Sequence, residues 1–138
     1  MMGKKVIVMA EDEPTIRDAV KETLEDNFEL HMAENGKIVL ELLKKVKPDV
    51  ILLDVMMPVM GGLEACKMLK QDESTAKVPV IFLTAKGQIT DVEKGFIVGA
   101  DSYIVKPFTA GILRQKLNTI LSKVEVRKRM QGENTSKA

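Results

Sequence analysis

Cysteine is nearly absent from this chain, which has Cys66 alone among its 138 residues. A disulfide within the chain is therefore excluded, and so is a metal site built from several cysteines. Tryptophan is missing and aromatic residues make up only 4% of the sequence, so the core must consist mainly of aliphatic side chains. We expect Cys66 to be a small, buried apolar group.

Long hydrophobic runs are also missing. The first apolar stretch covers residues 6–10 and stops at Glu11, which is too short for a signal peptide or a membrane span. The formal net charge of +1 gives the whole chain no electrostatic drive toward nucleic acids or membranes. We therefore expect a cytoplasmic protein with no membrane partner and no direct nucleic-acid partner.

The length fits one domain, which we place at residues 4–124. Residues 123–138 carry five basic and two acidic residues, a net charge of +3, and the remainder of the chain is slightly acidic. Apolar periodicity fades after Val124. The sequence therefore predicts that residues 125–138 are a basic helix end followed by a disordered tail.

Five short apolar runs predict β-strands. Residues 6–10, 50–53 and 80–83 are rich in β-branched residues and hardly alternate, which is typical of strands buried on both faces of a parallel sheet. Residues 28–32 alternate and residues 102–105 form a short run, so both suit the sheet edges.

Helical patterns lie between these runs. Pro14 suits a first helical turn, Gly99 is expected to close a helix over residues 88–98, and Thr109 is expected to cap the last helix. Strand and helix alternate along the whole chain. This order predicts an α/β fold, a doubly wound five-stranded parallel sheet with helices on both faces.

Polar side chains follow four of the predicted strands. Glu11 and Asp12 follow the first strand, Asp54 the third, Thr84 the fourth and Lys106 the fifth. Because ligands bind beyond the carboxyl ends of the strands in such sheets, we expect these groups to converge. Three carboxylates repel one another, and a hard divalent cation such as Mg²⁺ would offset that repulsion.

A carboxylate held beside Mg²⁺ and an amine could act as a nucleophile toward a phosphoryl group. Lys106 would supply the amine, and the Thr84 hydroxyl could donate to a phosphoryl oxygen. Each residue taken singly also has a simpler structural explanation: Asp12 could cap a helix, Asp54 could be a turn residue, and Lys106 could be solvated. Because five suitable residues follow four strand ends, one shared site explains them better than a separate structural role for each residue.

Five motifs follow one another in the chain: Ala10-Glu11-Asp12-Glu13-Pro14, Leu53-Asp54-Val55-Met56-Met57-Pro58, Leu83-Thr84-Ala85, Gly99-Ala100-Asp101-Ser102-Tyr103 and Val105-Lys106-Pro107-Phe108. With these motifs the sequence resembles the receiver-domain family of two-component signalling from Lys5 to Leu121. The resemblance implies a flavodoxin-like strand order, 2-1-3-4-5. It also implies a phosphorylation-dependent switch rather than an enzyme, with only self-directed phosphotransfer and slow autodephosphorylation.

The resemblance implies a phosphoacceptor and a metal site. Asp54 would accept a phosphoryl group from a histidine kinase, a histidine phosphotransfer protein or a small phosphodonor. Asp12, Asp54 and the backbone carbonyl of Met56 would bind Mg²⁺, or Mn²⁺ in its place, and Glu11 would act through a metal-bound water. Met56 and Lys86 stand where a water-orienting group could lie, so we expect phosphoryl loss to be slow.

The resemblance also implies a switch. Thr84 and Lys106 would bind the phosphoryl group, and a cis bond to Pro107 would position the lysine. Tyr103 would move inward, and the small Ala85 would leave the site open to donors. The altered face would bind a downstream protein partner or a second phosphorylated copy.

Alternative functions remain open. The chain could be the receiver of a larger regulator whose output domain is missing. It could also be a phosphatase with an aspartate nucleophile, although Met56 stands where such enzymes need a second acid. A flavin or nucleotide site would need a glycine- or hydroxyl-rich loop, whereas residues 11–14 are acidic and end in proline.

Overall fold

The computed structural model describes residues 3–85, 94 and 98–137, with the backbone alone for residues 132–137. The strands are β1 (Lys5–Ala10), β2 (Phe28–Ala33), β3 (Val50–Asp54), β4 (Val80–Ala85) and β5 (Ser102–Lys106). The helices are α1 (Pro14–Leu24), α2 (Gly36–Leu42), α3 (Gly62–Gln71) and α5 (Ala110–Lys137).

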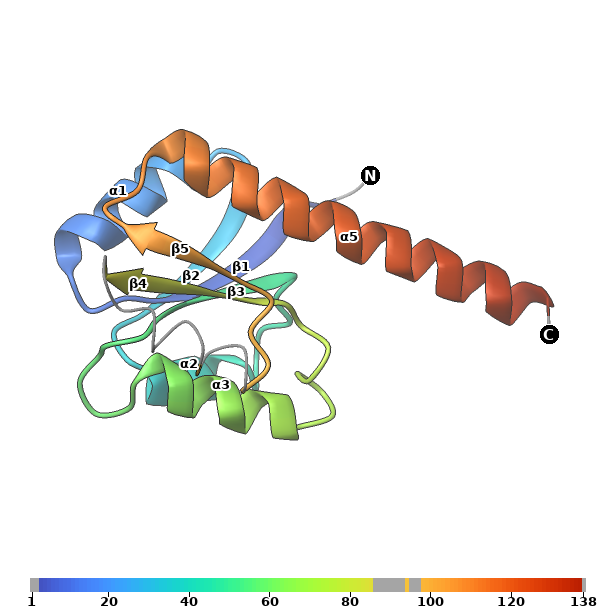
Figure 1. Cartoon of the computed structure of the whole chain (residues 1–138), viewed down its shortest axis with the longest axis horizontal. Coiled ribbons are helices and arrows are strands. Elements are labelled where there is room, and N and C mark those ends of the chain that lie inside the picture. Colours follow the sequence, from blue (N-terminus) through green and yellow to red (C-terminus); the bar gives the residue numbers. More distant parts are fainter. Residues whose placement is uncertain (1–2, 86–93, 95–97, 138) are drawn as a thin grey trace.

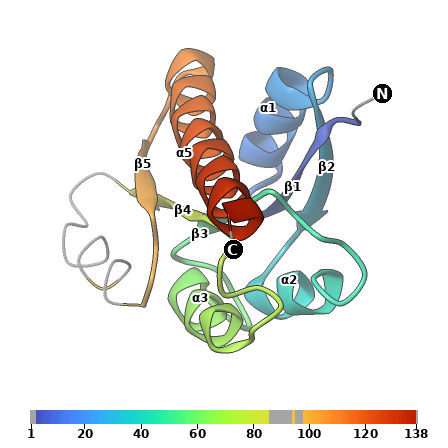
Figure 2. The ribbon, with the colours of Figure 1, turned by 90° about the vertical axis from the view of Figure 1, so that its right-hand side faces the viewer.

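All five strands are parallel and form one sheet in the order β2-β1-β3-β4-β5. The predicted fold class and strand order are therefore confirmed. Helices α1 and α5 cover one face of the sheet, and α2 and α3 cover the other (Figures 1 and 2). Parallel pairing brings the carboxyl ends of the strands to one edge, which positions the groups that follow them.

Two layers of aliphatic side chains hold the helices on the sheet. In β1, Ile7 and Met9 pack with side chains of α1 and α5. Val8 and Ala10 pack with α2 and α3 on the opposite face. Because each central strand is covered on both faces, its residues are apolar without alternation. Cys66 is buried in the second layer, as the sequence predicts.

Helix starts follow the sequence signals. Pro14 is the first residue of α1. The Asn35 side chain accepts a hydrogen bond from Ile38 N at 3.0 Å and caps α2. Thr109 Oγ1 accepts from Ile112 N at 3.1 Å and caps α5. These side chains satisfy amide groups that the first helical turn leaves without partners.

One predicted helix lies largely outside the described residues, because residues 86–93 and 95–97 are not described. Lys86 belongs to that segment. Lys94 is helical, and its carbonyl accepts a hydrogen bond from Val98 N at 3.1 Å. Gly99 follows with φ +103°, the left-handed conformation that suits a helix end.

The chain differs from expectation beyond Val124, because α5 continues to Lys137 through the residues predicted to include a disordered tail. Most residues from Arg127 to Gln131 have high helix propensity, which favours continuation of the helix. Among the described residues, no helix is long and apolar enough to cross a membrane. The domain limits of 4–124 stay a prediction.

Candidate functional site

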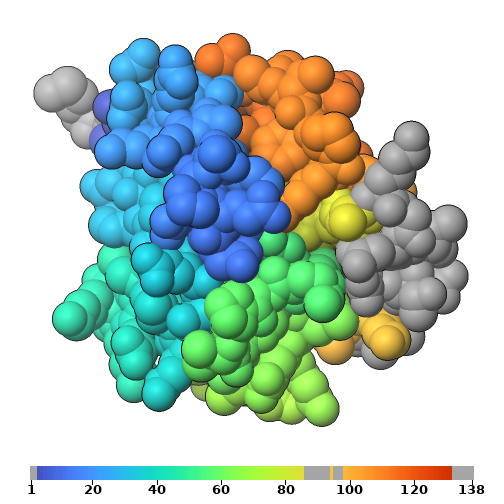
Figure 3. All heavy atoms as spheres, turned by 90° about the vertical axis from the view of Figure 1, so that its left-hand side faces the viewer, coloured from blue at the N-terminus to red at the C-terminus, as the bar shows by residue number. Residues whose placement is uncertain are grey.

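The carboxyl ends of the central strands place acidic and basic side chains next to one another. Asp54 is the last residue of β3 and pairs with Leu83, so Thr84 lies one residue further along β4. Ala85 pairs with Lys106 at the end of β5. Figure 3 shows this face, where segments of β1–α1, β3–α3 and β5–α5 meet around the end of β4.

Three carboxylates gather at this edge. Glu11, Asp12 and Asp54 each offer an oxygen within 4.8 Å of the others. Lys106 Nζ donates to Asp54 Oδ2 at 2.7 Å and lies 2.6 Å from Glu11 Oε1. The predicted residues Glu11, Asp12, Asp54 and Lys106 thus form one cluster, in which the amine offsets part of the acidic charge.

Glu11 is the most deeply placed member of the cluster, with no exposed side-chain surface. Burial and the nearby Asp54 carboxylate together raise the pKa of Glu11 to about 8, although Lys106 opposes the shift. Burial by itself would lower the pKa of Lys106, but the contacts with Asp54 and Glu11 outweigh it and raise that pKa. The site therefore holds more acidic groups than its one lysine can neutralise.

Thr84 adds another buried polar side chain to this edge. Its hydroxyl oxygen is buried and has no hydrogen-bond partner in the described part of the chain. A buried hydroxyl without a partner costs about 1–3 kcal/mol. The Oε1 atom of Glu11 is also buried and makes an ion-pair contact without hydrogen-bond alignment. Both groups could bind an additional ligand at this edge.

The loop after β3 holds Asp54 in place. Met56 N donates to Asp54 Oδ1 at 3.0 Å, and Gly62 N donates to Val55 O at 3.1 Å. A Cβ atom at position 62 would overlap the carbonyl oxygen of Asp54. Gly62 is therefore needed for the close approach of α3 to the site, a role that the sequence analysis missed.

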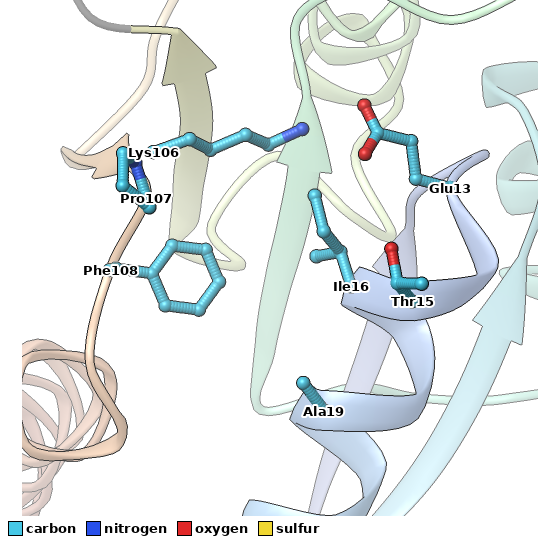
Figure 4. A pocket seen from close by; sticks show the side chains of 7 residues that line it. All are labelled: Glu13, Thr15, Ile16, Ala19, Lys106, Pro107 and Phe108. Atoms are coloured by element: carbon cyan, nitrogen blue, oxygen red, sulfur yellow. The ribbon is translucent and has the colours of Figure 1, made fainter.

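An open groove of about 450 Å³ adjoins the cluster. Glu13, Ile16 and Ala19 of the α1 segment line one side, and Pro107 and Phe108 line the other (Figure 4). The groove is mainly apolar. The sequence motifs contain Pro107 and Phe108, but their spacing did not indicate a groove, because α1 is distant in sequence.

The other predicted site residues do not belong to the acidic cluster itself. Met56 contacts Asp54 through its backbone amide, and the residue as a whole is 65% exposed. Tyr103 is 37% exposed on β5, with Lys116 Nζ 5.7 Å from its ring centre. Ala85 is exposed at the end of β4. The bond between Lys106 and Pro107 is cis. The functional roles predicted for Met56, Tyr103, Ala85 and Pro107 stay predictions.

The acidic cluster suits a hard divalent cation. Carboxylate and carbonyl oxygens are the ligands preferred by Mg²⁺, and Glu11, Asp12 and Asp54 offer such oxygens from three adjacent positions. A cation would also favour the ionised form of Glu11, whose pKa is raised by burial and by the nearby Asp54 carboxylate.

Comparison with known proteins identifies relatives. Residues 7–118 match the response regulator receiver domain. The phosphate regulon transcriptional regulatory protein PhoB of Pseudomonas aeruginosa is 40% identical over 88% of this chain and 53% of its own length. Histidine kinase P4 of Formosa agariphila is 37% identical over 86% of this chain and 9% of its own length.

Two solved structures share the fold. The chemotaxis response regulator CheY4 of Vibrio cholerae has a TM-score of 0.81 and 31% identity, covering 86% of this chain and 99% of its own. A receiver domain of a Pseudomonas aeruginosa sensor histidine kinase has a TM-score of 0.81 and 25% identity, covering 87% and 99%. That structure holds a magnesium ion in its active-site cleft.

The chain spans about half, or less, of the length of the first curated relatives that it matches. The match nevertheless covers most of this chain, and it includes most of β1, the other four strands and the first part of α5. The sheet order and the acidic edge agree with it. The chain belongs to the response regulator receiver domain family.

Proposed function

We propose that this chain is a phosphorylation-dependent signalling switch in which Asp54 accepts the phosphoryl group. The contact between Asp54 Oδ2 and Lys106 Nζ, 2.7 Å, carries the proposal. Together with Glu11 and the buried Thr84 hydroxyl at the same edge, this contact supports the roles of nucleophile for Asp54, cation for Lys106 and hydrogen-bond donor for Thr84. Phosphoryl transfer chiefly requires such positioning and charge neutralisation.

Asp12 and Asp54 would bind Mg²⁺ directly, with the backbone carbonyl of Met56, while Glu11 would act through a metal-bound water. The acidic cluster supports this assignment, as does the magnesium ion in the related kinase receiver. When bound, Mg²⁺ would neutralise charge that develops on the transferred oxygens. We expect Mn²⁺ to substitute, because it also accepts oxygen ligands.

In the transfer step, the Asp54 carboxylate attacks phosphorus. A bond forms between the carboxylate oxygen and phosphorus, and the bond between phosphorus and the donor nitrogen of a phosphohistidine breaks. Lys106 would neutralise one phosphoryl oxygen, and the Thr84 hydroxyl would donate to another. The exposed Ala85 at the end of β4 leaves space for the donor.

The switch follows from the new charge. A phosphoryl group adds up to about two negative charges and would draw Thr84 and Lys106 toward it. Tyr103 would then move inward from its exposed position on β5, which changes the surface of that edge. A downstream protein partner, or a second phosphorylated copy of the chain, would bind the changed surface.

The groove between α1 and Phe108 suits the phosphodonor protein, because it is apolar and borders Lys106. A histidine kinase or a histidine phosphotransfer protein would place its histidine above Asp54 from there. Since the curated relatives are longer, we also keep the alternative that the chain is the receiver of a larger regulator. Either form would act in the cytoplasm.

Treatment with phosphoramidate, with and without Mg²⁺, tests the proposal by intact mass. The expected result is one added phosphoryl group on the wild type, dependent on Mg²⁺, and none on Asp54→Asn. Lys47→Ala serves as a control, because Lys47 is exposed on the α2–β3 connection, at the opposite edge of the sheet. Uptake that persists in Asp54→Asn would contradict the assignment, and rapid release of phosphate without a lasting phosphorylated form would instead indicate a phosphatase.

A further inference from the structure

A second cavity lies at the opposite edge of the sheet from Asp54. It has a volume of about 380 Å³ and lies between the α3–β4 connection and the distal part of α5. Its wall includes residues that precede β4 and β5, so it is at the amino ends of these strands. In Figure 1, α5 extends past the sheet at this end. Six lining residues matter here: Lys70, Lys77, Asp101, Val124, Arg127 and Lys128.

Lys70 and Asp101 compensate each other within the wall. Lys70 Nζ donates to Val78 O at 2.6 Å and to Ala76 O at 3.1 Å, and it lies 3.7 Å from Asp101 Oδ2. Asp101 Oδ2 also accepts a hydrogen bond from Val80 N at 2.9 Å. Since Lys70 Nζ and Asp101 Oδ2 already have partners and their charges are opposite, this pair is structural and adds no net charge to the cavity.

The other three charged residues of the wall are all basic. Lys77, Arg127 and Lys128 are exposed, and no ion pair involves any of them within the described ranges. Lys128 acts electrostatically on Glu125, but the Glu125 carboxylate lies 2.8 Å from Lys5 Nζ and is paired with it. The cavity therefore has positive charge that no neighbouring side chain fully offsets.

We propose that this cavity binds a small anion that carries two or more phosphate groups. The guanidinium of Arg127 offers paired donors that match phosphate geometry, and the two lysines add point charges. Sites for small ligands commonly have volumes of about 300–1,000 Å³, and this cavity falls within that range. Val124 adds an apolar contact that suits an organic part of the ligand.

The ligand would bridge two elements that are distant in sequence. Lys77 belongs to the connection before β4, whereas Arg127 and Lys128 belong to the distal part of α5. A bound diphosphate would thus hold distal α5 against that connection. A duplex nucleic acid fits less well. Its phosphate backbone is best bound by cations spread along an extended surface, whereas these cations line one small cavity.

Titration with pyrophosphate, followed by amide NMR on the unphosphorylated protein without Mg²⁺, tests the proposal. We expect saturable shifts at residues 76–78 and 124–131, and binding about tenfold weaker in Arg127→Ala, since a paired hydrogen-bonded contact to phosphate is lost. Lys47→Ala removes the same charge from an exposed position outside the cavity, and it should leave the affinity nearly unchanged.

Three results would overturn the proposal. The first is the absence of shifts at residues 76–78, or shifts confined to residues around Lys106. The second is an equal loss of affinity in Arg127→Ala and Lys47→Ala, which would indicate attraction by overall charge. The third is binding of a duplex oligonucleotide to the same amides without competition from pyrophosphate. Because neither phosphorylation nor Mg²⁺ is used, failure here is distinct from failure of the phosphoacceptor assignment.

Discussion

Val59 adopts φ +68° in the loop after Asp54, the one positive φ at a non-glycine residue in the described part of the chain. Val59 is 79% exposed, so packing offsets little of the strain. A left-handed conformation at a non-glycine residue costs about 1–3 kcal/mol. The loop that positions the proposed phosphoacceptor is thus strained at a branched residue.

Val59→Gly should stabilise the protein by about 0.5–1 kcal/mol, because glycine adopts positive φ without strain but has more freedom in the unfolded chain. Urea denaturation measures the change in the free energy of unfolding. Val59→Ala is the matched control, since it shortens the side chain but keeps the Cβ atom. Equal stabilisation by both substitutions would contradict relief of backbone strain as the cause.

Met56→Asn should accelerate loss of the phosphoryl group, because an amide two residues after Asp54 could orient a hydrolytic water that a thioether cannot. Phosphoprotein decay in Mg²⁺ buffer, followed by intact mass, measures the rate. Met56→Leu keeps the apolar character and should decay like the wild type. Slower decay in Met56→Asn, or a wild-type lifetime of seconds, would contradict this prediction.

Cys66 should resist alkylation in the folded protein. Burial raises the pKa of the thiol to about 11, so the reactive thiolate is scarce at pH 8 and increases only as the pH approaches that value. Iodoacetamide labelling followed by mass spectrometry measures the rate, with protein in urea as the control. Labelling of folded protein as fast as unfolded protein at pH 8 would contradict the buried position.

At the scale of the element, the start of α5 depends on one side chain. Thr109→Ala removes the oxygen that accepts from Ile112 N and should lower the free energy of unfolding by about 1 kcal/mol. Thr109→Ser keeps the acceptor and serves as the control. Thermal and urea denaturation measure both variants. Equal stability of Thr109→Ala and the wild type would show that the cap contributes nothing.

Strands and helix starts followed from short-range signals in the sequence. The β-branched run of residues 50–53 predicted a buried strand, and β3 occupies Val50–Asp54. Pro14 and Thr109 predicted helix starts that the structure confirms. The length of α5 was harder to predict, because residues 127–131 have high helix propensity while the apolar periodicity fades after Val124, and the two signals conflict.

For the whole molecule, the acidic edge links metal binding to folding. Mg²⁺ should raise the melting temperature, because it binds the folded cluster and relieves the repulsion between Asp54 and the Glu11–Asp12 pair, which folding brings together. At a Mg²⁺ concentration about 100-fold above its dissociation constant, the free energy of unfolding would rise by about 2.7 kcal/mol. Differential scanning calorimetry measures it.

Asp12→Asn is the matched control for that experiment. Asp12 is exposed, so the substitution removes one proposed ligand without opening the core. The variant should fold but lose most of the Mg²⁺-dependent stabilisation. An equal rise in melting temperature for the variant and the wild type would contradict direct binding by Asp12.

Sequence by itself determined the fold class and the chemical types at the carboxyl ends of the strands, because strand period and helix start depend on neighbouring residues. Tertiary structure alone decided that Glu11 contacts Lys106, that Tyr103 lies exposed, and that α1 and Phe108 border a groove. These features depend on side-chain directions and on packing between distant segments. A linear pattern can indicate which strand end a residue follows, but distances and burial exist only in the folded chain.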